Sequence, residues 1–354
     1  MLTAGERMVT YRAVMMGFGN VGRAVATLFL QRGASIARDH GVAVRFVLVA
    51  DRSGAAVDPV GLDLQRLLDV KARTGGVAAY PGGGQPGLGG ATAVASIAAN
   101  LLLEASPTSV RTGEPGLAHI RAALSRGMHV VTANKGPLVV AYRDLTRLAH
   151  ERGVELRYVG TVAAPTPALE LARYALHGAV VESIEAVPNA TTNYILTLME
   201  AGHALEDGIR AAQEAGIAET DPALDVEGWD SAAKILILAN SVMGGDLRLD
   251  EVDVEGISAV TTALLTQVRR QGCALKLLAS VRRGPRGLHA AVAPTPLPLE
   301  HPLARLRHTG MAVLVHTDLL GDLLVSVEGD SPLGTAQAML RDVVNITRER
   351  RLSS

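Results

Sequence analysis

The sequence of 354 residues contains one cysteine, few aromatic residues and no close histidine pair, and these shortages exclude several kinds of site. The single cysteine, Cys273, excludes an internal disulfide framework and a cysteine-based metal cluster, which indicates a reducing compartment and predicts a cytoplasmic protein. The histidines form no H-E-x-x-H pattern, so no zinc site is expected. His129, in an apolar strand, is interpreted as a packed residue.

An excess of charge of one sign is also lacking, because 34 Lys and Arg residues stand against 35 Asp and Glu residues. This balance shows no polyanion-binding signature, and nucleic acid is not expected as a partner. No uncharged run approaches the roughly 18 to 20 residues of a membrane span, and Met1 to Thr10 lacks the apolar core of a signal peptide. Neither a membrane partner nor secretion is therefore expected. The length suggests two or three domains.

Lysine is scarce in this arginine-rich chain, where it occurs only at Lys71, Lys135, Lys234 and Lys276. Arginine cannot release its proton in the useful pH range, whereas burial and neighbouring charges can tune a lysine. A remaining lysine is therefore a candidate for proton chemistry, and Lys234 is the strongest of the four. Lys71 and Lys276 are interpreted as compositional chance.

The segment from Ala218 to Lys234 holds five acidic residues and then enters an apolar run over residues 235–239. Asp230 and Lys234 are four residues apart, so they lie on one face of the expected helix. A surface ion pair is the alternative interpretation of this pair. The apolar run favours a buried helix, and buried charge needs a partner or a function. The pattern predicts a polar reaction site, and its spacing does not match a calcium loop.

A nucleotide-binding motif lies near the N-terminus. A β-prone run over residues 12–16 meets Gly17-Phe18-Gly19-Asn20-Val21-Gly22, and residues 23–31 follow with helical spacing. This order of strand, glycine turn and helix predicts a dinucleotide site in which the helix N-terminus faces the pyrophosphate. The next strand, over residues 43–50, ends in Asp51, which favours NAD, but Arg52 suits the 2'-phosphate of NADP. The choice between NAD and NADP stays open.

Further apolar runs over residues 100–105 and 128–132 alternate with helical patterns over residues 116–126 and 137–151. This alternation predicts a Rossmann-type, doubly wound parallel sheet. Ligands in such sheets bind beyond the carboxyl ends of the strands, so two loops are expected near the nicotinamide. The loops are Ser106-Pro107-Thr108 and Thr132-Ala133-Asn134-Lys135.

Residues 74–92 are too rich in glycine for a prediction of regular structure, and a mobile surface loop or, alternatively, a lid over the cofactor is expected.

A second, α+β domain is expected to begin near residue 161. Residues 161–167 contain two prolines and no charge, and helical and strand patterns then alternate irregularly. The predicted boundaries are 1–160 for the dinucleotide-binding domain, completed by 305–354, and 161–304 for the second domain. The final part contains strand patterns over residues 311–316 and 323–328 and a helical pattern over residues 332–344.

Four stretches, which together span nearly the whole chain, carry a family resemblance. They are Gly17 to Gly22; Gly113-Glu114-Pro115 with the later Val130 to Pro137; Asn189 to Leu196; and Glu219 to Lys234. In order and spacing the chain resembles the homoserine dehydrogenases, specifically the short type that lacks a C-terminal regulatory domain. The resemblance implies reversible NAD(P)-dependent interconversion of L-homoserine and L-aspartate 4-semialdehyde, on the route to threonine and methionine.

The resemblance also implies roles for single residues. Lys135 and Lys234 correspond to the catalytic lysines, with Lys234 held by Asp230, and the division of labour between the two lysines stays open. Glu219 and Asp225 correspond to positions that hold the ammonium group of the substrate. Three further positions, expected near the substrate and the domain hinge, are Asn189, Thr191 and Thr192. A homodimer built through the sheet of the second domain is implied as well.

In the family, the loop at residues 160–167 can bind a monovalent cation. Val159 stands here where a glutamate is usual, and Ala164 and Pro165 replace small flexible residues. The backbone carbonyls of Val162 and Ala164 remain as the possible ligands of such a cation.

Three other functions compete with this interpretation. An aspartate-semialdehyde dehydrogenase needs a nucleophilic cysteine, whereas Cys273 lies in a helical-looking apolar run without a histidine neighbour. A non-catalytic, nucleotide-binding redox sensor would require a basic DNA-reading module, which this near-neutral sequence does not show. A divergent paralogue with another amino-acid-like substrate stays open, because Ile217 replaces an aromatic residue that is frequent in the family.

Overall fold

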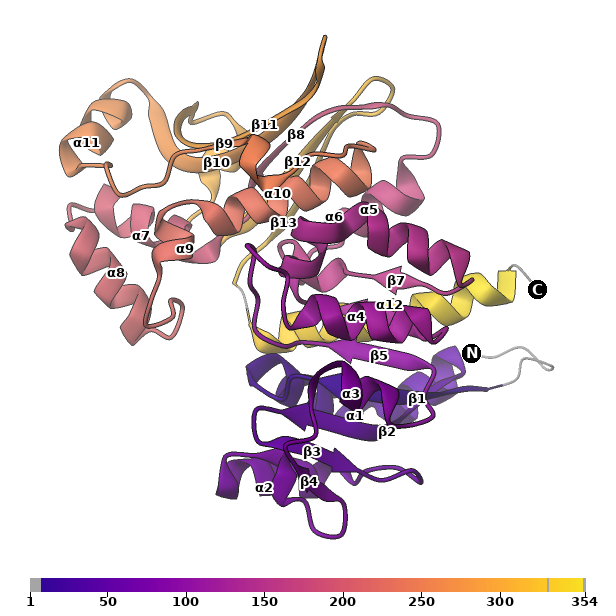
Figure 1. Ribbon diagram of the computed structural model, residues 1–354. Helices are drawn as coiled ribbons and strands as arrows, with labels where there is room; N and C mark the ends of the chain where they lie inside the picture. Colours follow the sequence, from indigo (N-terminus) through magenta and orange to yellow (C-terminus); the bar gives the residue numbers. More distant parts are fainter. Residues whose placement is uncertain (1–7, 330, 353–354) are drawn as a thin grey trace. The chain divides into compact units, whose positions relative to one another are not determined.

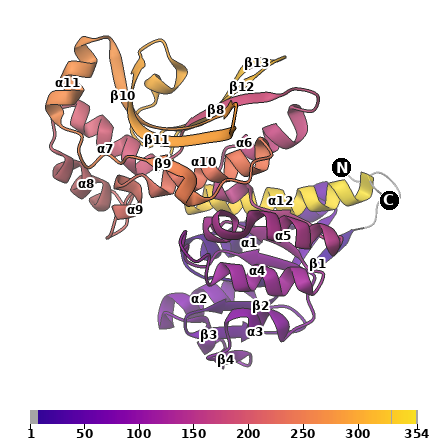
Figure 2. The ribbon, with the colours of Figure 1, turned by 45° about the horizontal axis from the view of Figure 1, so that its top comes forward.

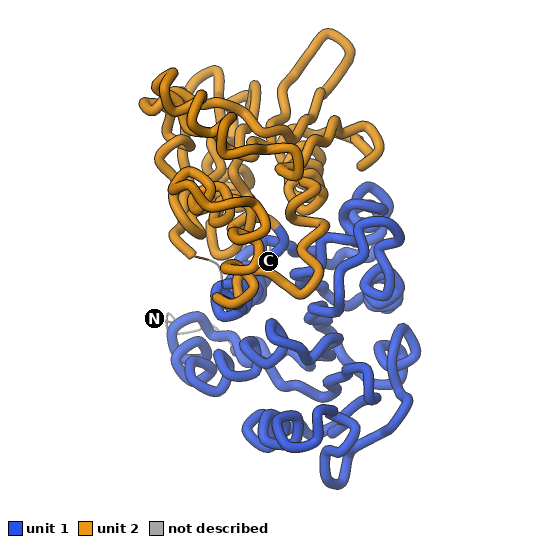
Figure 3. The backbone as a smooth tube through the Cα atoms, turned by 90° about the vertical axis from the view of Figure 1, so that its left-hand side faces the viewer, with its two compact units in different colours: residues 1–161, 331–354 blue, residues 162–330 orange. Residues whose placement is uncertain are grey.

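The computed structural model describes residues 8–329 and 331–352. The chain divides into two compact units: unit 1 comprises residues 1–161 and 331–354, and unit 2 comprises residues 162–330 (Figure 3). The prediction that Met1 to Thr10 holds no signal peptide concerns residues that mostly lie outside the described ranges. No helix in those ranges combines the length and the apolar character that crossing a bilayer requires.

Unit 1 contains a seven-stranded sheet with the order β4-β3-β2-β1-β5-β6-β7 (Figure 1). β2, β1, β5, β6 and β7 pair in parallel, which confirms the predicted doubly wound sheet. β3 and β4 extend one edge through two antiparallel pairs, β2 with β3 and β3 with β4, which the sequence pattern did not indicate. The strands are β1 (Val9–Met16), β2 (Val42–Asp51), β3 (Gly54–Val57), β4 (Gly84–Pro86), β5 (Leu101–Glu104), β6 (His129–Thr132) and β7 (Leu156–Arg157).

Two groups of helices pack around this sheet. α1 packs against α2 and against the C-terminal α12, which Figure 2 shows beside it, whereas α4 packs against α3 and α5. The core between the sheet and the first group joins Met15 and Phe29 with Met339 and Val343. The helices are α1 (Asn20–His40), α2 (Leu64–Thr74), η1 (Val77–Ala79), α3 (Gly90–Ala95), α4 (Gly116–Ser125), α5 (Lys135–Glu151), η2 (Val159–Thr161) and α12 (Pro332–Leu352).

The glycine-rich segment at residues 74–92 forms η1, β4 and the start of α3, so the expectation that it lacks regular structure is wrong. Its glycines permit close packing of backbone against backbone. A Cβ atom at Gly83 would lie 2.2 Å from the carbonyl oxygen of Val57, and one at Gly84 would lie 2.0 Å from that of Ala78. Glycine at these positions therefore signals close approach within a sheet edge.

Unit 2 contains a six-stranded mixed sheet with the order β13-β12-β8-β10-β11-β9. Its pairs are antiparallel except for β9 and β11, which run in parallel, and the predicted α+β character is confirmed. The strands are β8 (Val181–Val187), β9 (Val252–Val254), β10 (Cys273–Gly284), β11 (Gly287–Pro298), β12 (Met311–Thr317) and β13 (Gly321–Val327).

The helix α10 packs against β8, β10 and β11, and α7 packs against α8, α11 and β10. Ten successive residues of α10, from Ser231 to Asn240, are buried, which confirms the predicted buried helix. The helical elements of unit 2 are α6 (Ala168–Glu170), η3 (Leu171–Ala175), α7 (Ala190–Glu200), α8 (Leu205–Glu214), α9 (Ala223–Val226), α10 (Trp229–Val242), η4 (Leu249–Glu251), α11 (Thr262–Arg270) and η5 (Pro302–Arg305).

Two predictions about the C-terminal half are wrong. The return to unit 1 begins at residue 331 rather than 305, because β12 pairs with β8 and thereby belongs to the sheet of unit 2. Cys273 does not lie in a helix but begins β10, where it is half-buried. An apolar run of this length is compatible with a buried strand as well as with a helix, and its pairing with β11 decides the outcome.

Candidate active site

The glycine turn between β1 and α1 is shaped for close backbone approach. Gly17 has a φ of 95°, and a Cβ atom there would lie 2.3 Å from the carbonyl oxygen of Ala105. A Cβ atom at Gly22 would lie 2.2 Å from the carbonyl oxygen of Gly17. Gly19, the N-cap of α1, has open space at its Cβ position, and no described side chain caps this helix. Free N–H groups beside an open glycine suit the pyrophosphate of a dinucleotide.

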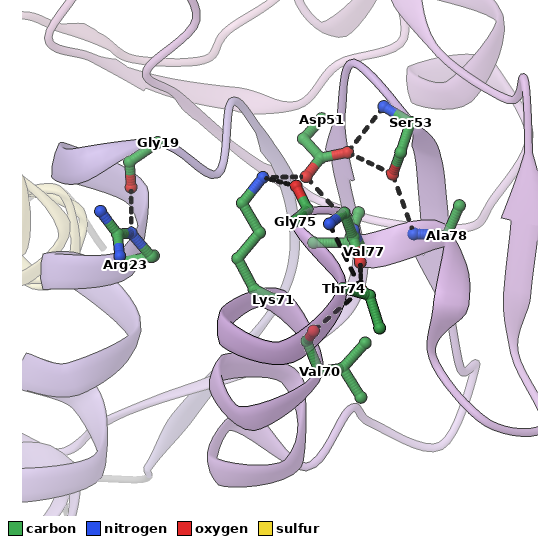
Figure 4. Close-up of polar contacts among 11 residues, drawn as sticks. Gly19, Arg23, Asp51, Ser53, Val70, Lys71, Thr74, Gly75, Val77 and Ala78 are labelled. Atoms are coloured by element: carbon green, nitrogen blue, oxygen red, sulfur yellow. Dashed lines mark hydrogen bonds and ion pairs between the residues drawn. The ribbon is translucent and has the colours of Figure 1, made fainter.

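The side chains of this turn differ in what they can contact. Phe18 is 1% exposed and belongs to the core, so only its backbone groups are available to a ligand, whereas Val21 is half-buried against the same core. Arg23, on the first turn of α1, donates to Asn20 Oδ1 at 2.7 Å. It also donates to the carbonyl oxygen of Gly19 at 3.3 Å (Figure 4). The motif does not include Arg23, although its guanidinium places a positive charge beside the predicted phosphate site.

Asp51 ends β2, and groups of unit 1 surround its carboxylate (Figure 4). Oδ1 accepts hydrogen bonds from the backbone N–H of Ser53 at 2.8 Å and from the Ser53 hydroxyl at 2.6 Å. Oδ2 accepts from Lys71 Nζ at 2.6 Å and from the backbone N–H of Val77 at 3.2 Å. The interpretation of Lys71 as compositional chance is therefore wrong, because this lysine forms an ion pair at the predicted ribose site.

Burial raises the pKa of Asp51, but the hydrogen bonds from Lys71 and Ser53 outweigh it and hold the pKa below its usual range. Four donors occupy the acceptor positions of the carboxylate, so a ribose hydroxyl would have to replace one of them. Arg52 is exposed and forms no hydrogen bond or ion pair with another described residue. Asp51, Arg52 and Lys71 together bring two positive charges and one negative charge to this region.

The loops after β5 and β6 lie together, as the strand order requires. Asn134 caps α5, and its Nδ2 donates to the carbonyl oxygens of Ser106 and Pro107, each at 3.2 Å. Its backbone N–H donates to the hydroxyl of Thr132 at 3.0 Å, and both Thr132 and Asn134 are buried. Thr108 is exposed. The structure thus brings four of the residues predicted near the nicotinamide to the carboxyl ends of adjacent parallel strands.

In unit 2, Lys234 is a buried cation within the apolar helix α10. Its Nζ lies 2.6 Å from Oδ2 of Asp230 and donates to the carbonyl oxygen of Pro188 at 2.7 Å. The two side chains of the ion pair are 10% and 12% exposed, so the surface-pair interpretation is wrong. α10 begins after Gly228, whose φ of 89° is a left-handed backbone conformation that favours glycine.

Asn189 connects the two aspartates of this region. Its Nδ2 donates to Oδ1 of Asp225 at 2.6 Å and to Oδ2 of Asp230 at 2.7 Å. Its Oδ1 accepts from the backbone N–H of Thr192 at 2.8 Å and thereby caps α7. Asn189 is 4% exposed, and its amide already has partners for both its nitrogen and its oxygen. This arrangement favours a positioning role over direct contact with a substrate.

The other predicted residues are more widely distributed. Thr192 directs its hydroxyl to Asn189, and Thr191 donates to the carbonyl oxygen of Ile217 at 3.3 Å, in the loop that leads to Glu219. Glu219 is exposed, and its side chain bonds to none of the described residues. Lys135 begins α5 in unit 1 and is half-buried. The structure therefore groups Asn189, Asp225, Asp230 and Lys234 within unit 2.

Metal binding receives no support from acidic, histidine or cysteine side chains. Within the described ranges, no group of three or more of these residues is arranged to hold a metal ion. Val162 and Ala164 are buried, and a monovalent cation held by their backbone carbonyls stays a prediction.

Lys276 is the second lysine that composition alone does not explain. It is 0% exposed in β10, and its Nζ donates to Asn193 Oδ1 at 3.0 Å and to the carbonyl oxygen of Leu306 at 2.6 Å. Asn193 Nδ2 in turn donates to the carbonyl oxygens of His308 and Gly310. Lys276 therefore joins α7 to the segment before β12, and its interpretation as chance is wrong.

Two protein-family models match the chain. Residues 167–344, half of the chain, match the model described as Homoserine dehydrogenase. Residues 1–109 match the model described as Glutamate/Leucine/Phenylalanine/Valine dehydrogenase. The second match covers less than a third of the chain and lies wholly within unit 1.

Full-length relatives extend this similarity. The homoserine dehydrogenase of Methanocaldococcus jannaschii is 36% identical over 334 residues, covering 94% of this chain and 97% of that protein. The NAD(+)-dependent homoserine dehydrogenase of Pseudomonas canavaninivorans is 36% identical and covers 96% of this chain and 97% of its own length.

Solved structures agree with these matches. The homoserine dehydrogenase of Thermoplasma acidophilum superposes with a TM-score of 0.83 at 27% identity, covering 96% of this chain and 100% of that one. A hyperthermophilic archaeal homoserine dehydrogenase in complex with NADPH also has a TM-score of 0.83, at 28% identity, and covers 96% and 98% of the two chains.

Proposed function

The chain belongs to the homoserine dehydrogenase family, and we propose that it carries out the reaction of that family by proton transfer at Lys234. It is an NAD(P)-dependent oxidoreductase that interconverts L-homoserine and L-aspartate 4-semialdehyde. Its reaction belongs to amino-acid biosynthesis, on the route to threonine and methionine. The observation that carries the proposed mechanism is the buried Lys234, held by Asp230 and by the carbonyl oxygen of Pro188.

Lys234 suits the transfer of a proton to or from an alcohol oxygen. A lysine ammonium has three donors, and the bonds to Asp230 and Pro188 use two of them. The third donor remains for an oxygen of the substrate. During reduction of the aldehyde, Lys234 donates a proton to the developing alkoxide, and during oxidation of the alcohol it receives that proton. Asp230 holds the ammonium in place and stabilises its charge.

Unit 1 holds the dinucleotide, which supplies or receives the hydride when it is bound. The N–H groups that begin α1 at Gly19 bind the pyrophosphate, and Arg23 adds a positive charge there. The end of β2, with Asp51, binds the adenosine ribose. The loops that contain Ser106 and Asn134 receive the nicotinamide end.

The amino-acid part of the substrate carries an ammonium group, and carboxylates are its natural partners. We assign this contact to Asp225 and Glu219, of which Asp225 lies beside the catalytic pair through the shared amide of Asn189. Asn189 itself acts as a positioning residue, because its donors and acceptor are already engaged. Lys135, at the start of α5, helps to place the carbonyl.

An assay of the purified protein with L-homoserine and NAD+ or NADP+, followed by the absorbance of the reduced nicotinamide, tests this function. Lys234→Met should lower kcat by at least about a hundredfold, which is the usual scale of general acid-base catalysis. Binding of the reduced cofactor should persist, and Lys234→Arg should not restore turnover, because arginine retains its proton. Full activity of Lys234→Met would refute the proton-transfer role, whereas absence of wild-type activity with both cofactors would refute the function.

We further propose a cytoplasmic homodimer that forms through the sheet of unit 2. β13 is an edge strand of that sheet, and Leu324 on it is 46% exposed. Leu319 and Leu320, in the preceding turn, are 72% and 52% exposed. Exposed leucines along an unpaired edge suit the surface of a second copy. Light scattering should give a dimer mass for the wild type and a monomer mass for Leu324→Arg.

A further inference from the structure

Glu104 is a fully buried carboxylate that has no role in the reaction as derived so far. It is the last residue of β5, and it is 0% exposed. Its Oε1 accepts a hydrogen bond from the backbone N–H of Ser106 at 3.1 Å and another from the Ser106 hydroxyl. Its Oε2 accepts from the hydroxyl of Thr132 at 3.3 Å. One side chain thus connects the loop after β5 with the end of β6.

His119, on α4, completes the set of donors around this carboxylate. It is 3% exposed, and its Nδ1 lies 3.3 Å from Oε1 of Glu104. Because a carboxylate oxygen can only accept, Nδ1 carries the proton of this bond. Four donors from three segments therefore satisfy Glu104, which is the condition under which a carboxylate is tolerated in a protein interior.

The loop at residues 105–107 is held from two further directions. A Cβ atom at Gly17 would lie 2.6 Å from the backbone nitrogen of Ser106, so the nucleotide-binding glycine turn packs directly on this loop. Asn134 Nδ2 donates to the carbonyl oxygens of Ser106 and Pro107. β5 lies between β1 and β6, so Glu104 stands where the three loops of the ligand-binding edge meet.

We propose that Glu104, supported by His119, is a positioning residue that holds the loop at residues 105–107 in the conformation that receives the nicotinamide end of the cofactor. This proposal rests on the proposed function in taking a nicotinamide dinucleotide as the ligand. Neither side chain contacts the cofactor. Their bonds order Ser106 and its neighbours before binding, and a loop that is already ordered costs less free energy to dock against.

The adenosine end of the cofactor has separate partners, namely the start of α1 and the region of Asp51. The proposal is therefore tested by comparing NADH with ADP-ribose, which lacks the nicotinamide, in titrations of the full-length protein. For Glu104→Gln, which preserves shape but replaces one acceptor by a donor, the Kd of NADH should rise about tenfold while that of ADP-ribose changes less than about twofold. Glu151→Gln, on the exposed surface of α5, is the matched control and should change neither value.

A second pair of variants keeps the test valid if Glu104→Gln does not fold. His119→Leu removes the donor to Glu104, whereas His119→Asn can place an amide N–H where Nδ1 lies. The leucine variant should bind NADH more weakly than the wild type while its affinity for ADP-ribose is unchanged. The asparagine variant should bind NADH like the wild type. An equal loss of affinity for NADH and for ADP-ribose would overturn the proposal. An unchanged affinity for NADH in the leucine variant would overturn it as well. These titrations need no homoserine, so their outcome is separate from that of the activity assay.

Discussion

The ammonium group of Lys71 lies 2.6 Å from Oδ2 of Asp51, and both side chains are largely buried. This ion pair changes the cofactor preference that is expected of the proposed ribose site. An aspartate at the end of the second strand would by itself favour NAD, because its charge repels a 2'-phosphate. Lys71 neutralises that charge, and Arg52 adds a further positive charge beside it. The structure therefore supports the binding of a 2'-phosphate more than the sequence motif does.

Lys71→Met should shift the cofactor preference away from NADP. The KM for NADP+ should rise about tenfold, the scale of one hydrogen bond to a charged group, because the variant leaves Asp51 unneutralised beside the phosphate. The KM for NAD+ should change less than about threefold. Steady-state kinetics with both cofactors measures the ratio, and Arg73→Met, an exposed cation on the same helix, serves as the control. An equal rise for both cofactors would contradict this prediction.

Asn189→Asp should disturb the proposed substrate-binding part of the site while keeping its shape. The new carboxylate can still cap α7, but it faces Asp225 and Asp230 without the amide donors that now hold them. Three adjacent negative charges repel one another, so kcat/KM for homoserine at pH 8 should fall by about tenfold or more. The loss should lessen as the pH is lowered, because protonation of one carboxylate relieves the repulsion. Asn100→Asp, whose side chain also accepts a backbone hydrogen bond, should keep the wild-type pH profile.

Lys276 should make the stability of the protein depend on pH in the alkaline range. Burial lowers the pKa of Lys276 from 10.5 to about 8; the charge of Glu200 opposes this shift and that of Arg307 assists it. Between pH 8 and 10.5 the unfolded chain holds a proton that the native protein lacks, so stability rises with pH over this window. Relative to Lys276→Met, the wild type should gain about 3 kcal/mol across it. Urea unfolding of both proteins at pH 7.5 and 10 measures this gain. Arg286→Met, the control, should show the same change in stability with pH as the wild type.

His129 should make the stability of the protein depend on pH in the acidic range. Burial, followed by the charges of Arg350 and Arg157, lowers its pKa from 6.5 to about 4. Between pH 4 and 6.5 the imidazole is protonated in the unfolded chain but neutral in the native protein. The free energy of unfolding therefore has its full value above pH 6.5 and decreases as the pH falls to 4. The loss relative to His129→Asn should be about 3 kcal/mol, measured by urea unfolding at pH 7 and 4.5. His150→Asn, at an exposed position, should show no such difference from the wild type.

Much of the fold was predictable because its signals are local. The glycine turn, the alternation of strand and helix, and the apolar run after Lys234 each report on residues within a few positions of one another. The same holds for Asp230 and Lys234, which one helical turn brings together. The errors arose where a local pattern suits two structures: glycines that permit close packing resemble those of a loop, and the apolar run at Cys273 suits a strand as well as a helix.

The sequence by itself determined the motifs, the buried helix that carries Lys234 and the family to which the chain belongs. The tertiary structure alone decided the pairs Asp51–Lys71, Glu104–Thr132 and Asn193–Lys276 and the position of Asn189 between two aspartates. Periodicity describes which face of an element a residue occupies, but not which element covers that face. Strand order and helix packing determine which element covers each face. They thereby bring residues that belong to no recognisable motif into contact with the residues of the proposed site.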